Sequence, residues 1–252
     1  MQQRLLAIES ATDWLSIALL EGDDPVLLRE ADGKRRHAAE LMPMIAEAFV
    51  TARWRLDDLA ALAVSTGPGS FTSLRIGLAT AKGLGFGRAL RGVGVSTLEA
   101  MAWAAFEGGA GGRREEVLVL LDARRGHWYA GSWRLDPSGG TLRACLPEGL
   151  YDPARLASDL ARPVVALSPE RPGWADGLRD AGLELTELIE GESARPRADR
   201  VARVARQALD RGEDVEVAAL SARYLRRAEA EAVRLGGPVE SGELARLEAK
   251  PR

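Results

Sequence analysis

The sequence predicts an α/β protein made of two units. Strand and helix patterns alternate through the first hundred residues, a glycine-rich linker follows at 107–114, and a new strand–turn–strand pattern begins after it. The chain has 252 residues, 46% of them hydrophobic, which is enough for two cores. We therefore expect an N-terminal α/β lobe at 1–106, a C-terminal α/β lobe at 115–235 whose last helix has the option of returning to the first lobe, and a loose tail at 236–252.

The first unit is predicted from its apolar periodicity. Three short apolar runs joined by polar turns indicate an antiparallel meander of strands over 5–8, 15–20 and 26–30. Helical spacing then predicts a helix over 37–54, with Pro43 in its first turn or at a kink. A strand at 60–64, a helix from Ser70, a strand at 91–95 and a helix at 97–106 follow. This order is typical of a mixed sheet with helices on its faces.

The second unit repeats the opening pattern more weakly. We expect a strand at 117–121, a turn at 122–126 and a hairpin partner at 127–133. Further along, the sequence predicts a strand at 163–167, a short helix at 174–181 and an amphipathic helix at 198–211. The segment 218–232 fits either a helix or an extended chain.

The turn Thr66-Gly67-Pro68-Gly69 joins a buried strand to a helix, and two interpretations compete for it. A glycine-rich turn before a helix can present backbone N–H groups to a phosphate, or it can be a tight structural connection. The strict motifs are absent, because Thr72 stands where a dinucleotide fingerprint needs glycine and Ala81 precedes Lys82, so the structural interpretation is favoured. Acidic residues in the turns could hold Mg²⁺ through water, but more often form turns. The candidate phosphate-proximal residues are Glu9, Thr12, Gly67, Gly69, Ser70 and Asp122.

The helices at 37–54 and 70–87 carry more apolar or small surface than one core contact uses. In the second helix a small residue recurs at every fourth position. This pattern predicts a partner surface, in which two helices pair with two helices of a related subunit, or else a helix seated closely on its own sheet. The candidate interface residues are Leu41, Met42, Met44, Ile45, Phe49, Gly69, Ser73, Leu74, Gly77 and Ala81.

Composition restricts the partners and the compartment. With 34 basic and 37 acidic residues the formal net charge is −3, so no global field favours nucleic acid or an anionic membrane. The single cysteine, Cys145, excludes an internal disulfide framework and fits a reducing compartment. The N-terminus is too short for a signal sequence, and no apolar run reaches the ~18 residues of a membrane helix. We expect a cytoplasmic protein.

No catalytic constellation is visible in the sequence. The two histidines, His37 and His127, stand in no metal-binding motif, and no catalytic or metal-ligating residue is predicted. Ser96 lacks the last glycine of a nucleophile elbow, and Glu99, three residues later, makes a helix capping box the better interpretation.

The central stretch 65–77, STGPGSFTSLRIG, closely resembles the signature of the bacterial TsaB (YeaZ) family. Further similar stretches are Leu41-Met42-Pro43-Met44-Ile45, GVSTLEA at 94–100, LDARRG at 121–126 and Tyr224-Leu225-Arg226. The resemblance covers roughly residues 4–230. The sequence departs from the family at Ser73, where glycine is usual, and at Glu9, where aspartate is usual.

The resemblance implies a two-lobed duplication of the actin/hexokinase/Hsp70-like type. It also implies a non-catalytic subunit of the machinery that makes N6-threonylcarbamoyladenosine in tRNA beside the anticodon. Its expected partners are the catalytic paralogue TsaD and the ATPase TsaE, with ATP or ADP and metal on those subunits and no cofactor of its own. A homodimer is an option when the chain is alone, the sequence leaving its oligomeric state open, and tRNA is reached through the complex. The alternatives are a small-molecule kinase of the same superfamily, which needs nucleotide affinity and a catalytic aspartate, and a metallopeptidase-like protein, which needs metal ligands.

Overall fold

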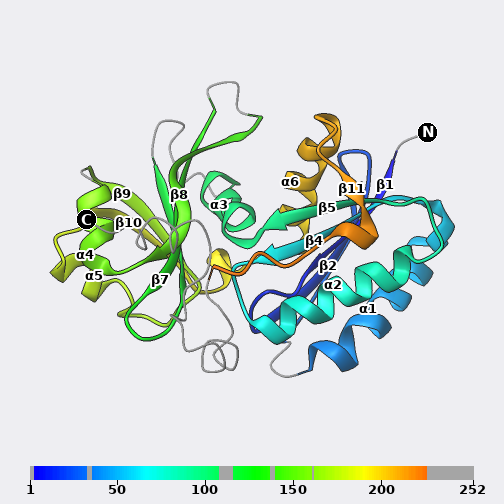
Figure 1. The fold of residues 1–252 in the computed structure, drawn as a ribbon, viewed down its shortest axis with the longest axis horizontal. Coiled ribbons are helices and arrows are strands. Elements are labelled where there is room, and N and C mark those ends of the chain that lie inside the picture. The colour runs from blue at the N-terminus through cyan, green and yellow to red at the C-terminus, as the bar shows by residue number, and fades with distance from the viewer. Residues whose placement is uncertain (1–2, 33–35, 108–115, 137–139, 161, 226–252) are drawn as a thin grey trace, which may run out of the picture. The chain divides into compact units, whose positions relative to one another are not determined.

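The computed structural model describes residues 3–32, 36–107, 116–136, 140–160 and 162–225. The chain divides into two compact units (Figure 1): unit 1 is Met1–Ala100 with Pro196–Arg223, and unit 2 is Met101–Arg195 with Tyr224–Arg252. Residues 196–223 therefore belong to the first unit, and the C-terminal lobe predicted at 115–235 is too long. Helix α6 (Ala198–Asp210) explains this, because it packs on the sheet of unit 1 and its Ala198 N–H donates to Ser16 Oγ at 2.9 Å.

Unit 1 is built on a six-stranded mixed sheet in the order β11-β5-β4-β1-β2-β3. Its strands are β1 (Arg4–Glu9), β2 (Trp14–Glu21), β3 (Asp24–Asp32), β4 (Leu59–Gly67), β5 (Arg91–Ser96) and β11 (Val215–Glu216). Strands β1, β2 and β3 form the predicted antiparallel meander, and β4 and β5 add to β1 in parallel. The parallel strands are buried, as their continuous apolar sequence predicts.

Helices cover both faces of this sheet. Helices α1 (His37–Ala52) and α2 (Phe71–Gly85) pack together over a core that includes Ile17 of β2. Ser16, the neighbouring residue, points to α6, and since successive strand residues face opposite sides, α6 covers the other face. Figure 1 shows α1 and α2 on one side of the sheet and α6 on the other. Helix α1 is shorter than predicted, because Arg53 adopts the left-handed conformation at φ 56°.

Unit 2 repeats the topology of unit 1 over five strands. Its sheet has the order β10-β9-β6-β7-β8. The strands are β6 (Val117–Asp122), β7 (Trp128–Leu135), β8 (Leu142–Tyr151), β9 (Val164–Ser168) and β10 (Leu185–Glu190). Again a three-stranded antiparallel meander is extended by two parallel strands on its first strand. This repeat confirms the predicted two-lobed duplication of the actin/hexokinase/Hsp70-like fold.

Several elements of unit 2 were not predicted from sequence. These are β8, β10 and the short helix α4 (Pro153–Asp159), while the predicted helix at 174–181 is reduced to α5 (Asp176–Asp180). Helix α3 (Thr97–Glu107) includes the boundary between the units. The segment left open at 218–232 begins as a 3-10 turn over Val217–Ala219 and has no helix as far as 225. Most of the predicted linker, from 108, and the whole predicted tail at 236–252 lie outside the described residues.

Candidate functional site: the first turn and the helical face

The first turn, residues 10–13 between β1 and β2, is closed by its own hydrogen bonds. Glu9, the last residue of β1, is fully buried, and its Oε1 accepts the N–H of Ala11 at 2.6 Å. The N–H of Ser10 donates to Ser65 Oγ at 3.2 Å. Thr12 is a turn former, since its Oγ1 accepts the N–H of Trp14 at 3.3 Å. The turn is therefore held from inside by side chains of the neighbouring strands.

The glycine-rich turn lies directly against this first turn. The Ser70 N–H donates to the carbonyl oxygen of Ala11 at 2.6 Å, and a Cβ on Gly69 would stand 2.2 Å from the same oxygen. Gly67 has a φ of 113° and also leaves no room for a side chain, because its Cβ would lie 2.8 Å from the Arg223 carbonyl. Backbone approach to the neighbouring chain thus accounts for these glycines, which supports the structural interpretation of the turn.

The N-terminus of α2 is also occupied by the chain itself. Ser70 is the N-cap residue, and its Oγ accepts the Ser73 N–H at 3.4 Å. With the Ser70 N–H directed to Ala11, two of the N–H groups nearest the turn already have partners within unit 1.

Burial dominates the electrostatics of Glu9. Desolvation raises its pKa from 4.5 to about 7, although the hydrogen bonds from Ala11 and the Ser65 hydroxyl lower it. Its second oxygen, Oε2, is buried without a hydrogen-bond partner among the described residues. A carboxyl with this pKa holds its proton for a large part of the time near neutral pH.

Asp122 occupies the equivalent position in unit 2, at the end of β6. Its Oδ1 accepts the Arg124 N–H at 2.7 Å, which repeats the contact between Glu9 and Ala11, and its Oδ2 pairs with the Arg124 guanidinium at 2.9 Å. Glu170 Oε1 accepts the Asp122 N–H at 3.2 Å. Of the candidate phosphate-proximal residues, Glu9, Thr12, Gly67, Gly69 and Ser70 gather at the first turn, whereas Asp122 belongs to the turn of the other unit.

The small-residue stripe of α2 faces the sheet of its own unit. A Cβ on Gly77 would stand 2.3 Å from Ser10 Oγ, and that hydroxyl donates to the Ser73 carbonyl at 3.1 Å. Leu74 and Ala81 are buried in the same contact. In α1, Leu41 and Ile45 are likewise buried in the core, and Met44 and Phe49 pack against it. The predicted interface residues Leu41, Ile45, Gly69, Ser73, Leu74, Gly77 and Ala81 therefore serve the core of unit 1, because the close approach of α2 to the first turn requires small side chains.

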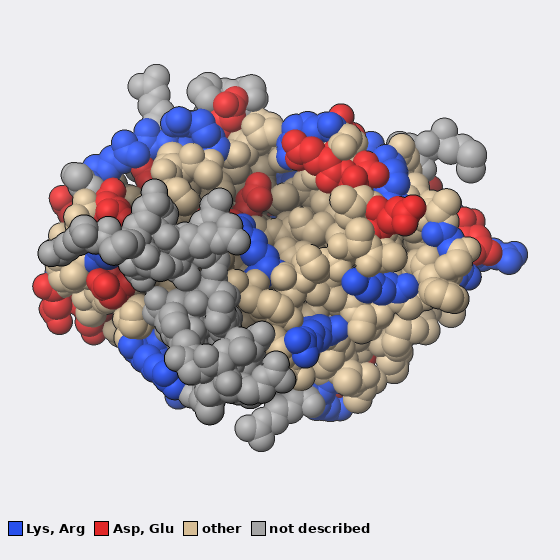
Figure 2. Space-filling model, viewed as in Figure 1, with Lys and Arg blue, Asp and Glu red and all other residues tan. Residues whose placement is uncertain are grey.

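A different set of residues on the same two helices is exposed. Met42 is 48% exposed, Val50 78% and Phe86, just after α2, 85%. Ala46 and Ala79 on these helices are also exposed, and a side chain at Gly83 would meet nothing within 4 Å. We call Met42, Ala46, Val50, Ala79, Gly83 and Phe86 the helical face. Figure 2 shows that the surface over α2 is mainly uncharged, with isolated Lys and Arg side chains.

Other predicted features have structural roles. His37 is buried in the first turn of α1, and His127 Nδ1 lies 3.1 Å from the Arg125 carbonyl in unit 2. Within the described ranges no group of three His, Cys, Asp or Glu side chains is arranged to hold a metal ion, and no helix there is long and apolar enough to cross a membrane. On α6, Arg206 pairs with Asp23 and Asp210.

Comparison with known proteins places this fold in a family. The family model for TsaD, tRNA N6-adenosine threonylcarbamoyltransferase, matches residues 31–169. The tRNA threonylcarbamoyladenosine biosynthesis protein TsaB of Escherichia coli K12 is 33% identical over 228 residues, which cover 88% of this chain and 94% of that protein. The chain belongs to the TsaB (YeaZ) family. TsaB of Bacillus subtilis 168 is 30% identical over 235 residues, 90% of this chain and 96% of that protein.

Solved structures agree with the TsaB assignment. YeaZ from Pseudomonas aeruginosa is 28% identical and has a TM-score of 0.76, with 88% of this chain and 100% of that chain covered. A protein described as similar to peptidase YEAZ, also from Pseudomonas aeruginosa, is 28% identical with a TM-score of 0.78, over 89% and 100% of the two chains. Glu9 and Ser73, the two positions at which the sequence was expected to depart from the family, are both buried.

Proposed function

We propose that this TsaB-family chain is a non-catalytic subunit of the machinery that makes N6-threonylcarbamoyladenosine in tRNA. It acts by pairing with a TsaD-like catalytic paralogue through the helical face. The names of the relatives and the TsaD family model support the pathway. The exposed apolar side chains on two adjacent helices support the mode of action and carry the proposal.

The helical face has the chemistry of a subunit contact. Phe86 and Val50 expose most of their side chains. Exposed patches of large apolar residues commonly mark an interaction site. Ala79 and Gly83 add a flat strip along α2, over which a partner helix can approach closely. A related subunit with two such helices would complete a four-helix contact. When no partner is available, the same face supports a homodimer.

The first turn supports a role without catalysis of its own. The Glu9 carboxyl is buried, with its pKa raised to about 7, and the Ser70 N–H is already bonded to the Ala11 carbonyl. In this proposal ATP or ADP and the metal belong to the TsaD-like and TsaE-like subunits, and tRNA is reached through the complex.

Affinity capture from the native cytoplasm tests the proposal. The tagged chain is expected to retain a TsaD-like paralogue, identified by mass spectrometry. Val50→Glu should lose it, because a charge would be buried at the contact. Val26→Glu is the matched control, since Val26 is an exposed valine on β3 of the same unit. Retention of the paralogue by Val50→Glu, or the absence of any TsaD-like protein from the wild-type capture, would contradict the proposal.

A further inference from the structure

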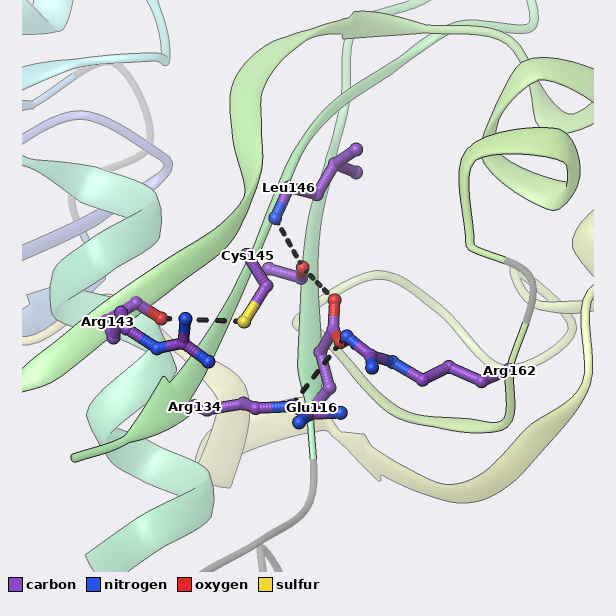
Figure 3. A network of polar contacts seen from close by, with 7 residues as sticks. Glu116, Arg134, Arg143, Cys145, Leu146 and Arg162 are labelled. Carbon is purple, nitrogen blue, oxygen red and sulfur yellow. Dashed lines mark hydrogen bonds and ion pairs between the residues drawn. The ribbon is translucent and has the colours of Figure 1, made fainter. Parts of the chain in front are cut away.

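An arginine cluster lies around one buried carboxylate in unit 2. Glu116, whose side chain is 2% exposed, precedes β6, and its Oε2 accepts two hydrogen bonds from the guanidinium of Arg162. Its Oε1 accepts a short hydrogen bond from the Ser132 hydroxyl of β7. Arg134 reaches Oε2 from the end of the same strand at 3.6 Å. Figure 3 shows Arg134 and Arg162 approaching Glu116 and the Arg143 side chain beside Cys145.

A β-bulge in β8 is part of this cluster. In the register of β7 and β8, Trp133 pairs with Ala144 and Ser132 with Leu146, so Cys145 is the extra residue. The Ser132 hydroxyl accepts the N–H of Leu146 at 2.9 Å while it donates to Glu116. The Ser132 hydroxyl, the Glu116 carboxylate and the Arg162 guanidinium thus stabilise the bulge. This is a structural role for these three residues.

The structural role does not account for the other two arginines. Arg134 and Arg143 stand directly opposite each other in the antiparallel pair, where like charges destabilise a sheet. Arg143 is exposed, and among the described residues its guanidinium has neither a hydrogen bond nor an ion pair. The Nε of Arg134 is buried, and it has no hydrogen-bond partner among the residues that the structure describes. Two guanidinium groups, those of Arg134 and Arg162, therefore share one carboxylate, and the third stands without a counter-ion in the described part of the chain. The three arginines and Glu116 together carry a local net charge of plus two.

The pKa of the single cysteine, Cys145, depends on the same charged groups. Burial and the Glu116 carboxylate raise the pKa of the Cys145 thiol, and Arg143, Arg134 and Arg162 lower it. The side chain is partly exposed. It therefore lies at the surface within the field of all four charged groups, where a bound anion would shield it.

We propose that Arg134, Arg143 and Arg162 form a contact site for the phosphate backbone of RNA. Arginine suits this chemistry because its planar fork pairs with phosphate oxygens in two places. The site is open rather than enclosed, since Arg143 is exposed and the Arg162 side chain is 52% exposed, and this fits a polymer that passes over the surface. The choice of RNA rests on the proposed role in tRNA modification. The site holds the substrate weakly and in one orientation while the partner subunit carries the chemistry.

Alkylation of Cys145 in the full-length chain tests this site, because Cys145 is the only thiol. The rate of reaction with N-ethylmaleimide is measured at low ionic strength with and without a tRNA transcript. The transcript should slow the reaction severalfold, and added salt should remove the protection, as it does for phosphate contacts. Arg143→Gln should raise the tRNA concentration needed for half protection by about two- to fivefold, the worth of one exposed ion pair.

Arg171→Gln is the matched control, because Arg171 is exposed in unit 2 outside the cluster and the change removes the same charge. It should keep the wild-type protection. Each rate is compared with that of the same variant without RNA, so an altered thiol pKa cancels, and Arg134→Gln is a second variant should Arg143→Gln lose its fold. The proposal is overturned if tRNA gives no protection, if Arg143→Gln and Arg171→Gln behave alike, or if inorganic phosphate at equal phosphate concentration protects as well as tRNA.

This test separates the RNA site from the partner contact. Arg143→Gln lies outside the helical face and should still capture the TsaD-like paralogue. Loss of RNA protection with retained capture would leave the proposed function standing, and loss of capture in the wild type would contradict that function whatever the RNA result.

Discussion

At the scale of single residues, Glu9 is the clearest case of a group whose environment changes its chemistry. From sequence it was a turn residue that could hold a metal through water, or a simple turn former. In the structure it accepts the Ala11 N–H as a turn former does, but complete burial raises its pKa to about 7. Sequence reasoning missed this because burial is decided by α2 and β4, which lie more than fifty residues away.

The raised pKa of Glu9 predicts how stability changes with pH. The native state binds the proton more tightly than the unfolded state, so its contribution is present below pH 4.5 and is lost as the pH rises through about 7. The loss amounts to roughly 3 kcal/mol of unfolding free energy between these limits. Glu9→Gln, which mimics the protonated carboxyl, should raise the melting temperature at pH 8 by several degrees and change it little at pH 4.5.

Thermal unfolding followed by circular dichroism at both pH values measures this difference. Glu170→Gln, at a partly exposed carboxyl of unit 2, is the control for the removal of one negative charge. Equal shifts of Glu9→Gln at the two pH values would show that the native pKa of Glu9 is not raised above its unfolded value.

At the scale of elements, helix α2 shows how much a pattern of small residues at every fourth position predicts. The spacing of small residues left two interpretations open, a subunit surface and a helix seated closely on its own sheet. Gly69, Ser73 and Gly77 make close contacts within unit 1, which supports the second interpretation. The sequence does not show that Ser10 comes within 2.3 Å of a Gly77 Cβ. Strand β8 was missed for a similar reason, because Pro147 and the bulge at Cys145 remove the regular alternation of a strand.

Two glycines of α2 should respond in opposite ways to the same substitution. Gly77→Leu would force a side chain into Ser10, an overpacking that costs typically 1–3 kcal/mol or more. Gly83→Leu points into open space and should gain up to about 1 kcal/mol from helix propensity. The melting temperature of the isolated chain should therefore fall for Gly77→Leu and hold or rise for Gly83→Leu. A normal melting temperature for Gly77→Leu would be incompatible with the contact seen at Ser10.

At the scale of the whole molecule, the meander, the linker and the second strand–turn–strand were enough to predict the duplication. The return of the last helix, α6, to unit 1 was left open by the sequence, because its apolar stripe fits either sheet, and the structure shows that it does return. The cluster around Glu116 was also hidden, since Arg134 and Arg143 become neighbours only through the register of β7 and β8, and Arg162 reaches Glu116 from the segment before β9. The arginines on and just after α6 are different, because Arg206 and Arg211 pair with acids of their own unit.

The charge of the whole chain predicts weak binding to tRNA by the isolated protein. A net charge of −3 releases few counterions, and the local positive charge of the arginine cluster around Glu116 is too small to change this at physiological salt. The dissociation constant should be weaker than about 1 μM there and should fall steeply as salt is lowered. Fluorescence anisotropy with a labelled tRNA measures it, and submicromolar binding at physiological salt would contradict the expectation.

The central claim is that this chain acts by pairing through the helical face, and calorimetric titration with the purified TsaD-like paralogue of the same organism tests it most directly. We predict a one-to-one complex with the wild type, and affinity reduced at least tenfold by Val50→Glu and by Gly83→Leu, since a buried charge or an overpacked contact costs more than about 1.4 kcal/mol. Val26→Glu should bind as the wild type does. Unchanged binding by both helical-face variants, with their folds intact, would place the partner elsewhere and refute the claim.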